Sequence, residues 1–173
     1  MALSLIAITA GTAIAKCGPG GMPSYNDISQ VVVFQSGCKS TLTPGPPISI
    51  GCSRYWAAFS YAGKSVYAQF NLPGSQGTYS VDLPLADIAQ LLQDHHFYSL
   101  SPAELVPTDV AETSIAVRRC GVTTVVKIYD EQEGQESEAL ALVAAINGRL
   151  GRAQKVRISR EPQAAPTVFD PWY

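Results

Sequence analysis

The sequence lacks most of the residues from which catalytic and metal centres are built. It has only two histidines, adjacent at His95 and His96, and four cysteines with no Cys-x-x-Cys pair. Zinc sites need clustered cysteine and histidine ligands, so we expect no metal site and no cofactor. The Gly-x-Ser-x-Gly pattern of a hydrolase nucleophile is also missing. The composition therefore favours a protein that is not an enzyme.

Net charge is also small. Twelve Lys and Arg residues against 14 Asp and Glu give a formal charge of −2 at pH 7, with a pI of about 5.6. Nucleic-acid-binding domains are normally basic, so we expect no nucleic-acid partner. Hydrophobic residues make up 46% of the 173 positions, which is enough for the core of one domain. We expect a monomer.

The N-terminus has no long membrane-spanning run. Residues 1–15 are apolar and end in Ala13-Ile14-Ala15, which matches a signal peptide with an A-x-A cleavage site. A spanning helix needs roughly 20 apolar residues, and no Lys or Arg precedes Lys16. We expect export to the periplasm or the extracellular space, with membrane contact only through this signal. The alternative is a buried N-terminal helix or strand.

The remaining chain divides by composition. Residues 16–27 form a Gly/Pro-rich lead-in, residues 28–150 a single domain, and residues 151–173 a basic and then Pro-rich C-terminal tail. Within the tail, residues 155–159 could also be an edge strand.

Hydrophobic periodicity predicts the elements of the domain. Alternating or β-branched patterns predict strands over 28–36, 54–61, 65–72, 78–83, 112–119 and 123–129. Helical spacing predicts one helix ending near Asp94, capped by Asp82, and a second from about Gln135 to Arg149. The expected fold class is α+β: an antiparallel sheet of two hairpins plus flanking strands, with two helices packed on one face.

Four cysteines in an exported protein suggest two disulfides, for which three pairings exist. Cys38 and Cys52 stand at the two ends of the Pro-rich segment 39–51. A Cys38–Cys52 bridge would close this segment and contribute on the order of 3 kcal/mol in the chain-entropy model. Cys17 and Cys120 would then form the second bridge, although Cys38 could instead pair with either of them.

Aromatic and basic residues are the candidate binding groups. The predicted first hairpin and its neighbour carry Tyr55, Trp56, Tyr61, Tyr67 and Tyr79. Tyrosine and tryptophan are common at interfaces, so this set could line a carbohydrate- or peptide-binding face, or half of it could belong to the core. The basic segment 149–160 could contact an anionic envelope lipid or glycan, or be a solvated helix end.

The candidate catalytic groups favour structural or surface roles. Adjacent histidines at a helix end point in different directions, so His95 and His96 are unlikely partners for one metal. Cys52 in the G-C-S-R segment resembles a nucleophile but has a ready disulfide partner. The carboxylate pairs are best interpreted as solvated charges; they are Asp109 with Glu112 and Asp130 with Glu131.

Residues 29–150 contain a series of spaced motifs at Cys38, Cys52, Tyr55, Phe97-Tyr98-Ser99-Leu100 and Thr108-Asp109. In these positions the chain resembles a family of exported bacterial domains catalogued only as a domain of unknown function, in which Cys-x-x-x-Cys-Pro-x-Tyr precedes a hairpin, a helix and a second hairpin with a helix. Ser53 stands where that family has proline, and segment 39–51 lengthens the cysteine spacing. The resemblance implies an exported α+β module and no activity, so it assigns no catalytic residues.

These observations favour a non-catalytic exported binding or structural module stabilised by disulfides, with an envelope protein or glycan as its partner. One alternative is a small secreted inhibitor or partner-binding protein that presents segment 39–51. Another is a small hydrolase or thiol enzyme that uses Cys52 or the pair His95 and His96.

Overall fold

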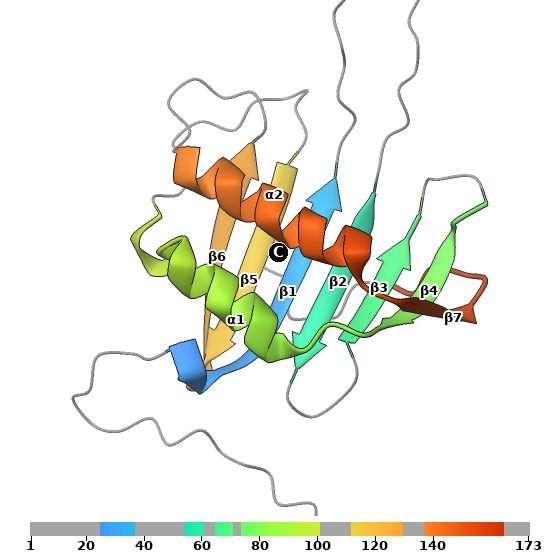
Figure 1. Ribbon diagram of the computed structural model, residues 1–173, viewed down its shortest axis with the longest axis horizontal. Coiled ribbons are helices and arrows are strands. Elements are labelled where there is room, and N and C mark those ends of the chain that lie inside the picture. The colour runs from blue at the N-terminus through green and yellow to red at the C-terminus, as the bar shows by residue number, and fades with distance from the viewer. Residues whose placement is uncertain are drawn as a thin grey trace, which may run out of the picture.

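A seven-stranded antiparallel sheet forms the body of the protein (Figure 1). The computed structural model describes residues 25–36, 54–60, 65–70, 74–100, 112–129 and 137–164. The strand order is β6-β5-β1-β2-β3-β4-β7. The strands are β1 (Ile28–Ser36), β2 (Tyr55–Ser60), β3 (Ser65–Gln69), β4 (Gly77–Val81), β5 (Glu112–Arg119), β6 (Val122–Tyr129) and β7 (Lys155–Ser159).

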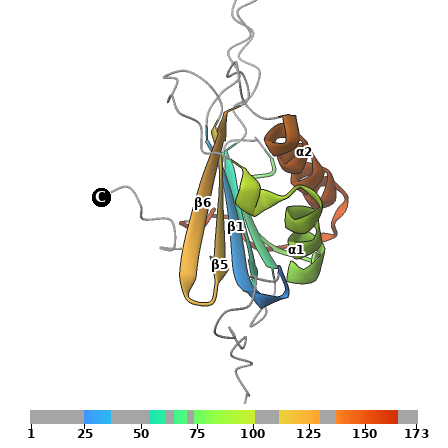
Figure 2. The same cartoon turned by 90° about the vertical axis from the view of Figure 1, so that its left-hand side faces the viewer.

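Both helices, α1 (Leu85–Asp94) and α2 (Ser137–Arg152), pack on the same face of the sheet (Figure 2). The short 3-10 helices η1 (Tyr25–Asp27) and η2 (Phe97–Ser99) precede β1 and follow α1. The main core fills the space between helices and sheet, and its fully buried members include Phe59, Ile88 and Leu142. The predicted α+β class, with two helices on one face, is confirmed.

Strand β2 lies in the middle of the sheet, as its sequence predicted. Its alternate residues Tyr55, Ala57 and Phe59 belong to the core beneath the helices. Trp56 points to the other face and is only 3% exposed. Strand β2 thus has buried side chains on both of its faces, which agrees with the apolar residues on both faces of this segment.

We call the face without helices the open face. A band of apolar side chains crosses it from β3 to β6, because these residues pair directly across neighbouring strands. The band consists of Val66, Ala58, Val32, Ala116 and Val125. Val32 and Ala116 form a small second core there, with Phe34 packed against it.

Several chain segments enter and leave at one end of the sheet. Gln35 pairs with Tyr55 in β2 and with Thr113 in β5, and Tyr55 pairs with Gln69 in β3. The segments outside the described residues that connect at this end are 37–53, 71–73, 101–111 and 130–136. At the opposite end, β5 and β6 are joined by the two-residue turn of Cys120 and Gly121.

Two local predictions need correction. Asp82 does not cap α1: the N-cap is Pro84, with no side-chain capping hydrogen bond. The Asp82 N–H instead donates to the carbonyl oxygen of Gln154 at 2.9 Å, which holds Asp82 beside β7 and delays the helix by two residues. The second helix ends at Arg152 and not at Arg149. Residues 155–159 form the edge strand β7, paired with β4, which agrees with one of the two interpretations of that segment. No helix in the described part of the chain is long and apolar enough to cross a membrane.

Candidate functional site

Three tyrosines from neighbouring strands form a row on the helix-covered face. Tyr67 pairs with Tyr79 across β3 and β4, and their ring centroids are 6.0 Å apart. The ring centroid of Tyr55 in β2 lies 5.3 Å from that of Tyr67. The row runs outward, because Tyr55 is buried whereas Tyr67 and Tyr79 are half-buried. The outer two rings are therefore accessible at the edge of the core.

The inner tyrosines are held by amide side chains. The Tyr55 hydroxyl donates to Oδ1 of Asn147 on α2, and the Tyr67 hydroxyl donates to Oε1 of Gln69. Gln69, 1% exposed, in turn donates through Nε2 to the carbonyl oxygen of Arg54 at 3.3 Å. Each buried polar group in this chain of contacts thus has a partner, as stability requires.

Strand β7 places two cations on the outer rings. The Arg157 guanidinium lies 5.3 Å from the Tyr79 ring centroid, and its Nη2 donates to the Tyr79 hydroxyl at 2.7 Å. The ammonium of Lys155 lies 5.4 Å from the Tyr67 ring centroid and donates to the carbonyl oxygen of Leu150 at the end of α2. Residues 155 and 157 share one side of a strand, so a single edge strand supplies both contacts.

Burial sets the protonation of this site. It raises the pKa of Tyr67 to about 12, with the neighbouring Tyr79 as a smaller cause. It also raises the pKa of Tyr55, to which Tyr67 contributes. Burial lowers the pKa of Lys155. The two phenols are therefore neutral hydrogen-bonding groups at physiological pH, and the site carries positive charge with no phenolate to oppose it.

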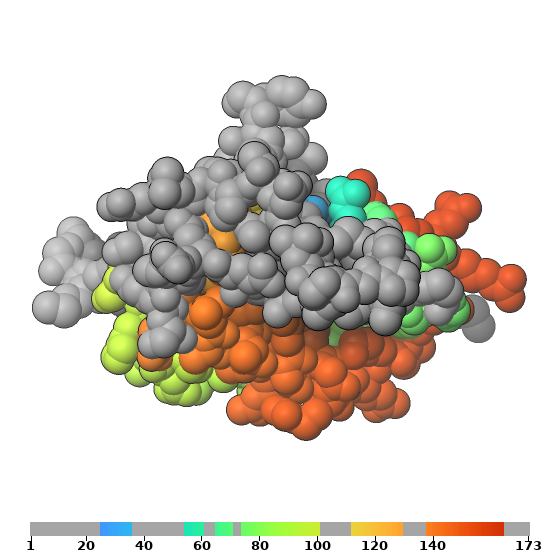
Figure 3. Space-filling view, turned by 90° about the horizontal axis from the view of Figure 1, so that it is seen from above, coloured from blue at the N-terminus to red at the C-terminus, as the bar shows by residue number. Residues whose placement is uncertain are grey.

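Two further cations lie at the end of the helix that precedes β7. Arg149 and Arg152 are exposed in the last turn of α2, which leads directly into β7. No ion pair is formed by Arg149, Arg152, Lys155 or Arg157 with another of the residues that the structure describes. We call the six residues the tyrosine–cation surface: Tyr67, Tyr79, Arg149, Arg152, Lys155 and Arg157. Figure 3 shows the orange-to-red surface of α2 and β7 beside the green surface of β4.

The structure separates the predicted aromatic set. Tyr55, Tyr67 and Tyr79 come together, but Trp56 points to the open face and Tyr61 lies outside the described residues. Trp56 is therefore not part of the same surface, because successive residues of a strand face opposite sides.

The two histidines do not share a site. His95 Nδ1 lies 2.7 Å from Oε1 of Glu138 and so links the end of α1 to the start of α2. His96 is exposed with φ of 49°, in the left-handed region. No group of three or more His, Cys, Asp or Glu residues that could hold a metal occurs among the residues described.

The remaining candidate residues fall partly outside the structure. Glu112 accepts a hydrogen bond from Ser114 and lies 3.8 Å from the ammonium of Lys127, so its contacts are on the sheet. Cys120 is not a free thiol. The predicted candidates that lie outside the described residues are Cys17, Cys38, Cys52, Asp109, Asp130, Glu131 and the segment 39–51. Both disulfide pairings and the thiol-enzyme alternative stay predictions.

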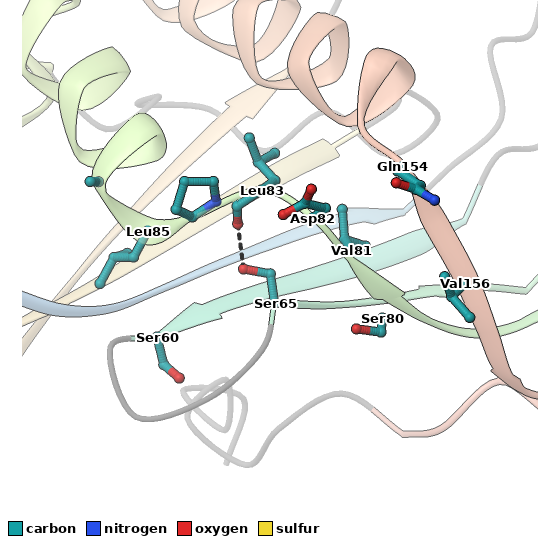
Figure 4. A pocket seen from close by; sticks show the side chains of 11 residues that line it. Ser60, Ser65, Ser80, Val81, Asp82, Leu83, Leu85, Gln154 and Val156 are labelled. Carbon is teal, nitrogen blue, oxygen red and sulfur yellow. Dashed lines mark hydrogen bonds between the residues drawn. The ribbon is translucent and has the colours of Figure 1, made fainter.

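A pocket of about 590 Å³ opens where α1 begins (Figure 4). Its polar lining comes from Ser60, Ser65, Ser80, Asp82 and Gln154. The Ser65 hydroxyl donates to the carbonyl oxygen of Leu83 at 2.5 Å, and the Asp82 and Gln154 backbones are hydrogen-bonded to each other. Part of the polar lining thus serves to hold the start of α1 against the sheet.

No protein-family model matches the chain, nor does any curated protein or solved structure. The resemblance to the exported family of unknown function therefore stays a prediction.

Proposed function

We propose that the protein is a non-catalytic exported binding module, and that it binds an acidic glycan at the tyrosine–cation surface. The observation that carries the proposal is the position of the charges. Lys155 and Arg157 lie against two half-buried tyrosine rings, and the exposed Arg149 and Arg152 stand in the last turn of α2, just before this strand, in a protein whose net charge is −2.

The chemistry favours a glycan over a simple anion. A half-buried tyrosine ring offers an apolar surface, which suits the apolar face of a sugar ring. The hydroxyls of Tyr67 and Tyr79 already donate within the protein, to Gln69 and to the carbonyl oxygen of Ser75. Arginine binds carboxylates with paired, charge-assisted hydrogen bonds. The exposed guanidinium groups of Arg149 and Arg152 at the end of α2 can supply that function next to the strand that carries Lys155 and Arg157. Uronic-acid polymers combine both features.

The test is binding of polygalacturonate, with dextran as a neutral glycan and polyglutamate as an acidic chain without sugar rings. We expect polygalacturonate to bind most tightly and its affinity to fall as salt rises, because exposed charges are screened. An exposed ion pair contributes roughly 0.2–1 kcal/mol. The double substitution Arg149→Gln with Arg152→Gln removes two such pairs and should therefore weaken binding by about two- to thirtyfold.

The matched control is Arg118→Gln, which removes an exposed cation from β5 on the open face. It should leave affinity for polygalacturonate unchanged. The proposal is wrong if polygalacturonate does not bind, if dextran binds equally well, or if Arg118→Gln weakens binding as much as the double substitution. Preference for polyglutamate would instead indicate an acidic protein partner and would overturn the glycan assignment.

A further inference from the structure

The open face has an apolar band that the helices do not cover. The band joins five strands through directly paired side chains, from Val66 in β3 to Val125 in β6. Phe34, Ala58 and Val125 are only partly buried there. A sheet with an apolar face is stable when another layer packs against that face. The C-terminal residues indicate which segment forms that layer.

The described end of the chain already lies on this face. After β7 the chain turns, and Thr78 Oγ1 donates to the carbonyl oxygen of Glu161 at 2.9 Å while accepting from the Gln163 N–H at 2.9 Å. Trp56 Nε1 then donates to the carbonyl oxygen of Gln163 at 2.8 Å. Thr78 and Trp56 are 0% and 3% exposed. Residues 161–163 thus run from β4 across β3 to β2.

We propose that residues 165–173 continue in this direction and lie across the apolar band, as a cover formed by the chain itself. The strands still to be crossed are β1, β5 and β6. Neighbouring strands are about 4.8 Å apart, so the distance from β2 to β6 is about 14 Å. Nine residues can extend to about 30 Å, which is more than enough.

The composition of this segment fits the face. It contains Val168, Phe169, Trp172 and Tyr173, with Asp170 as its one charged side chain. On the face, the exposed Arg54 guanidinium lies 5.7 Å from the Phe34 ring centroid and 5.6 Å from that of Phe70, so a cation stands beside the apolar band. Pro166 and Pro171 lack backbone donors and disfavour an added strand. The cover therefore packs through side chains.

Trp172 is the natural reporter, because the chain has one other tryptophan, Trp56. The difference between the full-length chain and its Trp172→Phe variant isolates the emission of Trp172. We expect that emission to be blue-shifted and acrylamide quenching to be at least threefold weaker than in urea-unfolded protein. Both values should be independent of protein concentration, because the contact is intramolecular.

Two substitutions on β6 supply the matched comparison. Val125→Asp places a charge in the band, whereas Val122→Asp alters a side chain that is already 68% exposed at the start of the same strand. Val125→Asp should release Trp172 to solvent, and Val122→Asp should not. Removal of residues 165–173 should increase binding of a hydrophobic dye severalfold.

The proposal is overturned if Trp172 is quenched equally in native and unfolded protein, or if Val122→Asp and Val125→Asp act alike. Protection of Trp172 that appears only as concentration rises, together with dimers in sedimentation, would assign the face to a second copy and also overturn it.

Discussion

The structure restricts which cysteines can pair, although three of the four lie outside the described residues. Cys120 follows Arg119, which pairs with Ile28 at the beginning of β1. Cys38 follows the end of the same strand by two residues, and Cys52 precedes Arg54 by two residues at that same end. Any bridge between Cys120 and either of these cysteines would therefore have to span the length of the sheet.

The distance can be bounded from chain geometry. Glu112 pairs with Ser36 and lies seven residues before Arg119 on the unbulged strand, which at about 3.3 Å per residue separates the two ends by about 23 Å. Consecutive Cα atoms are 3.8 Å apart, so the two links to Cys38 and the one to Cys120 can shorten this by at most about 11 Å. About 12 Å remains, whereas a disulfide needs a Cα–Cα distance of about 4.4–6.8 Å.

The opposite pairing is favoured by the strand register. Pairs between β1 and β2 run from Gln30–Ser60 to Gln35–Tyr55. Three more steps of the same register would place Cys38 opposite Cys52, at the Cα separation of about 4.5–5.5 Å found between facing residues of antiparallel strands. Cys17 is eight residues before Tyr25 and can extend about 27 Å. We therefore predict the bridges Cys38–Cys52 and Cys17–Cys120.

Peptide mapping under non-reducing conditions tests this prediction directly. A linked peptide that joins Cys120 to Cys38 or Cys52 would refute the register argument. In the chain-entropy model, the double variant Cys38→Ser with Cys52→Ser should lose about 3 kcal/mol of unfolding free energy in urea denaturation. The control is the same pair of substitutions in fully reduced protein, where they should change stability little.

Three further predictions follow from the described contacts. Gly77→Ala should lower the free energy of unfolding by about 3 kcal/mol or more, because φ is 142° and the new Cβ would lie 2.5 Å from a carbonyl oxygen of β7. Gly74→Ala, where φ is 82° and no atom lies within 4 Å of the new Cβ, should lower it by about 1 kcal/mol in the same urea assay. A double-mutant cycle of Tyr55→Phe and Asn147→Ala should give a coupling of about 1 kcal/mol, and zero coupling would contradict the hydrogen bond. The pKa of Tyr67 is raised from 10.0 to about 12 in the folded protein, so folded Tyr67 binds its proton more tightly than unfolded Tyr67. Its contribution to stability is therefore complete below pH 10 and is lost as the pH rises to about 12. Tyrosinate absorbance should show a titration step that coincides with unfolding, whereas complete titration of all tyrosines near pH 10 would contradict this prediction.

The sequence predicted the elements whose buried positions leave a clear pattern. Strand β2 has apolar residues on both faces and was placed correctly in the middle of the sheet, and α1 ends at Asp94 as its spacing indicated. Strand β7 could not be decided in this way. Its aliphatic side chains Val156 and Ile158 are 57% and 58% exposed, so its alternation does not distinguish core from solvent.

Long-range contacts decide what the sequence left open. The cap of α1 was assigned wrongly because Asp82 bonds to Gln154, which is remote in sequence. The candidate site was predicted in part, because the sequence analysis grouped Tyr55 with Tyr67. The alternate spacing of Lys155 and Arg157 could have shown that both cations lie on one side of a strand. Asn147 and Gln69 gave no signal, because their role depends on which strands become neighbours.

Residues 154–163 contact both faces of the sheet at the β4 edge, and this determines how binding can be tested. On the helix-covered face Arg157 contacts Tyr79, and on the open face Gln163 contacts Thr78 and Trp56. Removing Arg157 would therefore loosen β7 as well as delete a charge, so a loss of binding in that variant would have two explanations. Arg149 and Arg152 make no ion pair among the described residues and project from the end of α2. Their substitution changes charge while the contacts of β7 remain, so a change in glycan affinity at unchanged stability can be assigned to the tyrosine–cation surface itself.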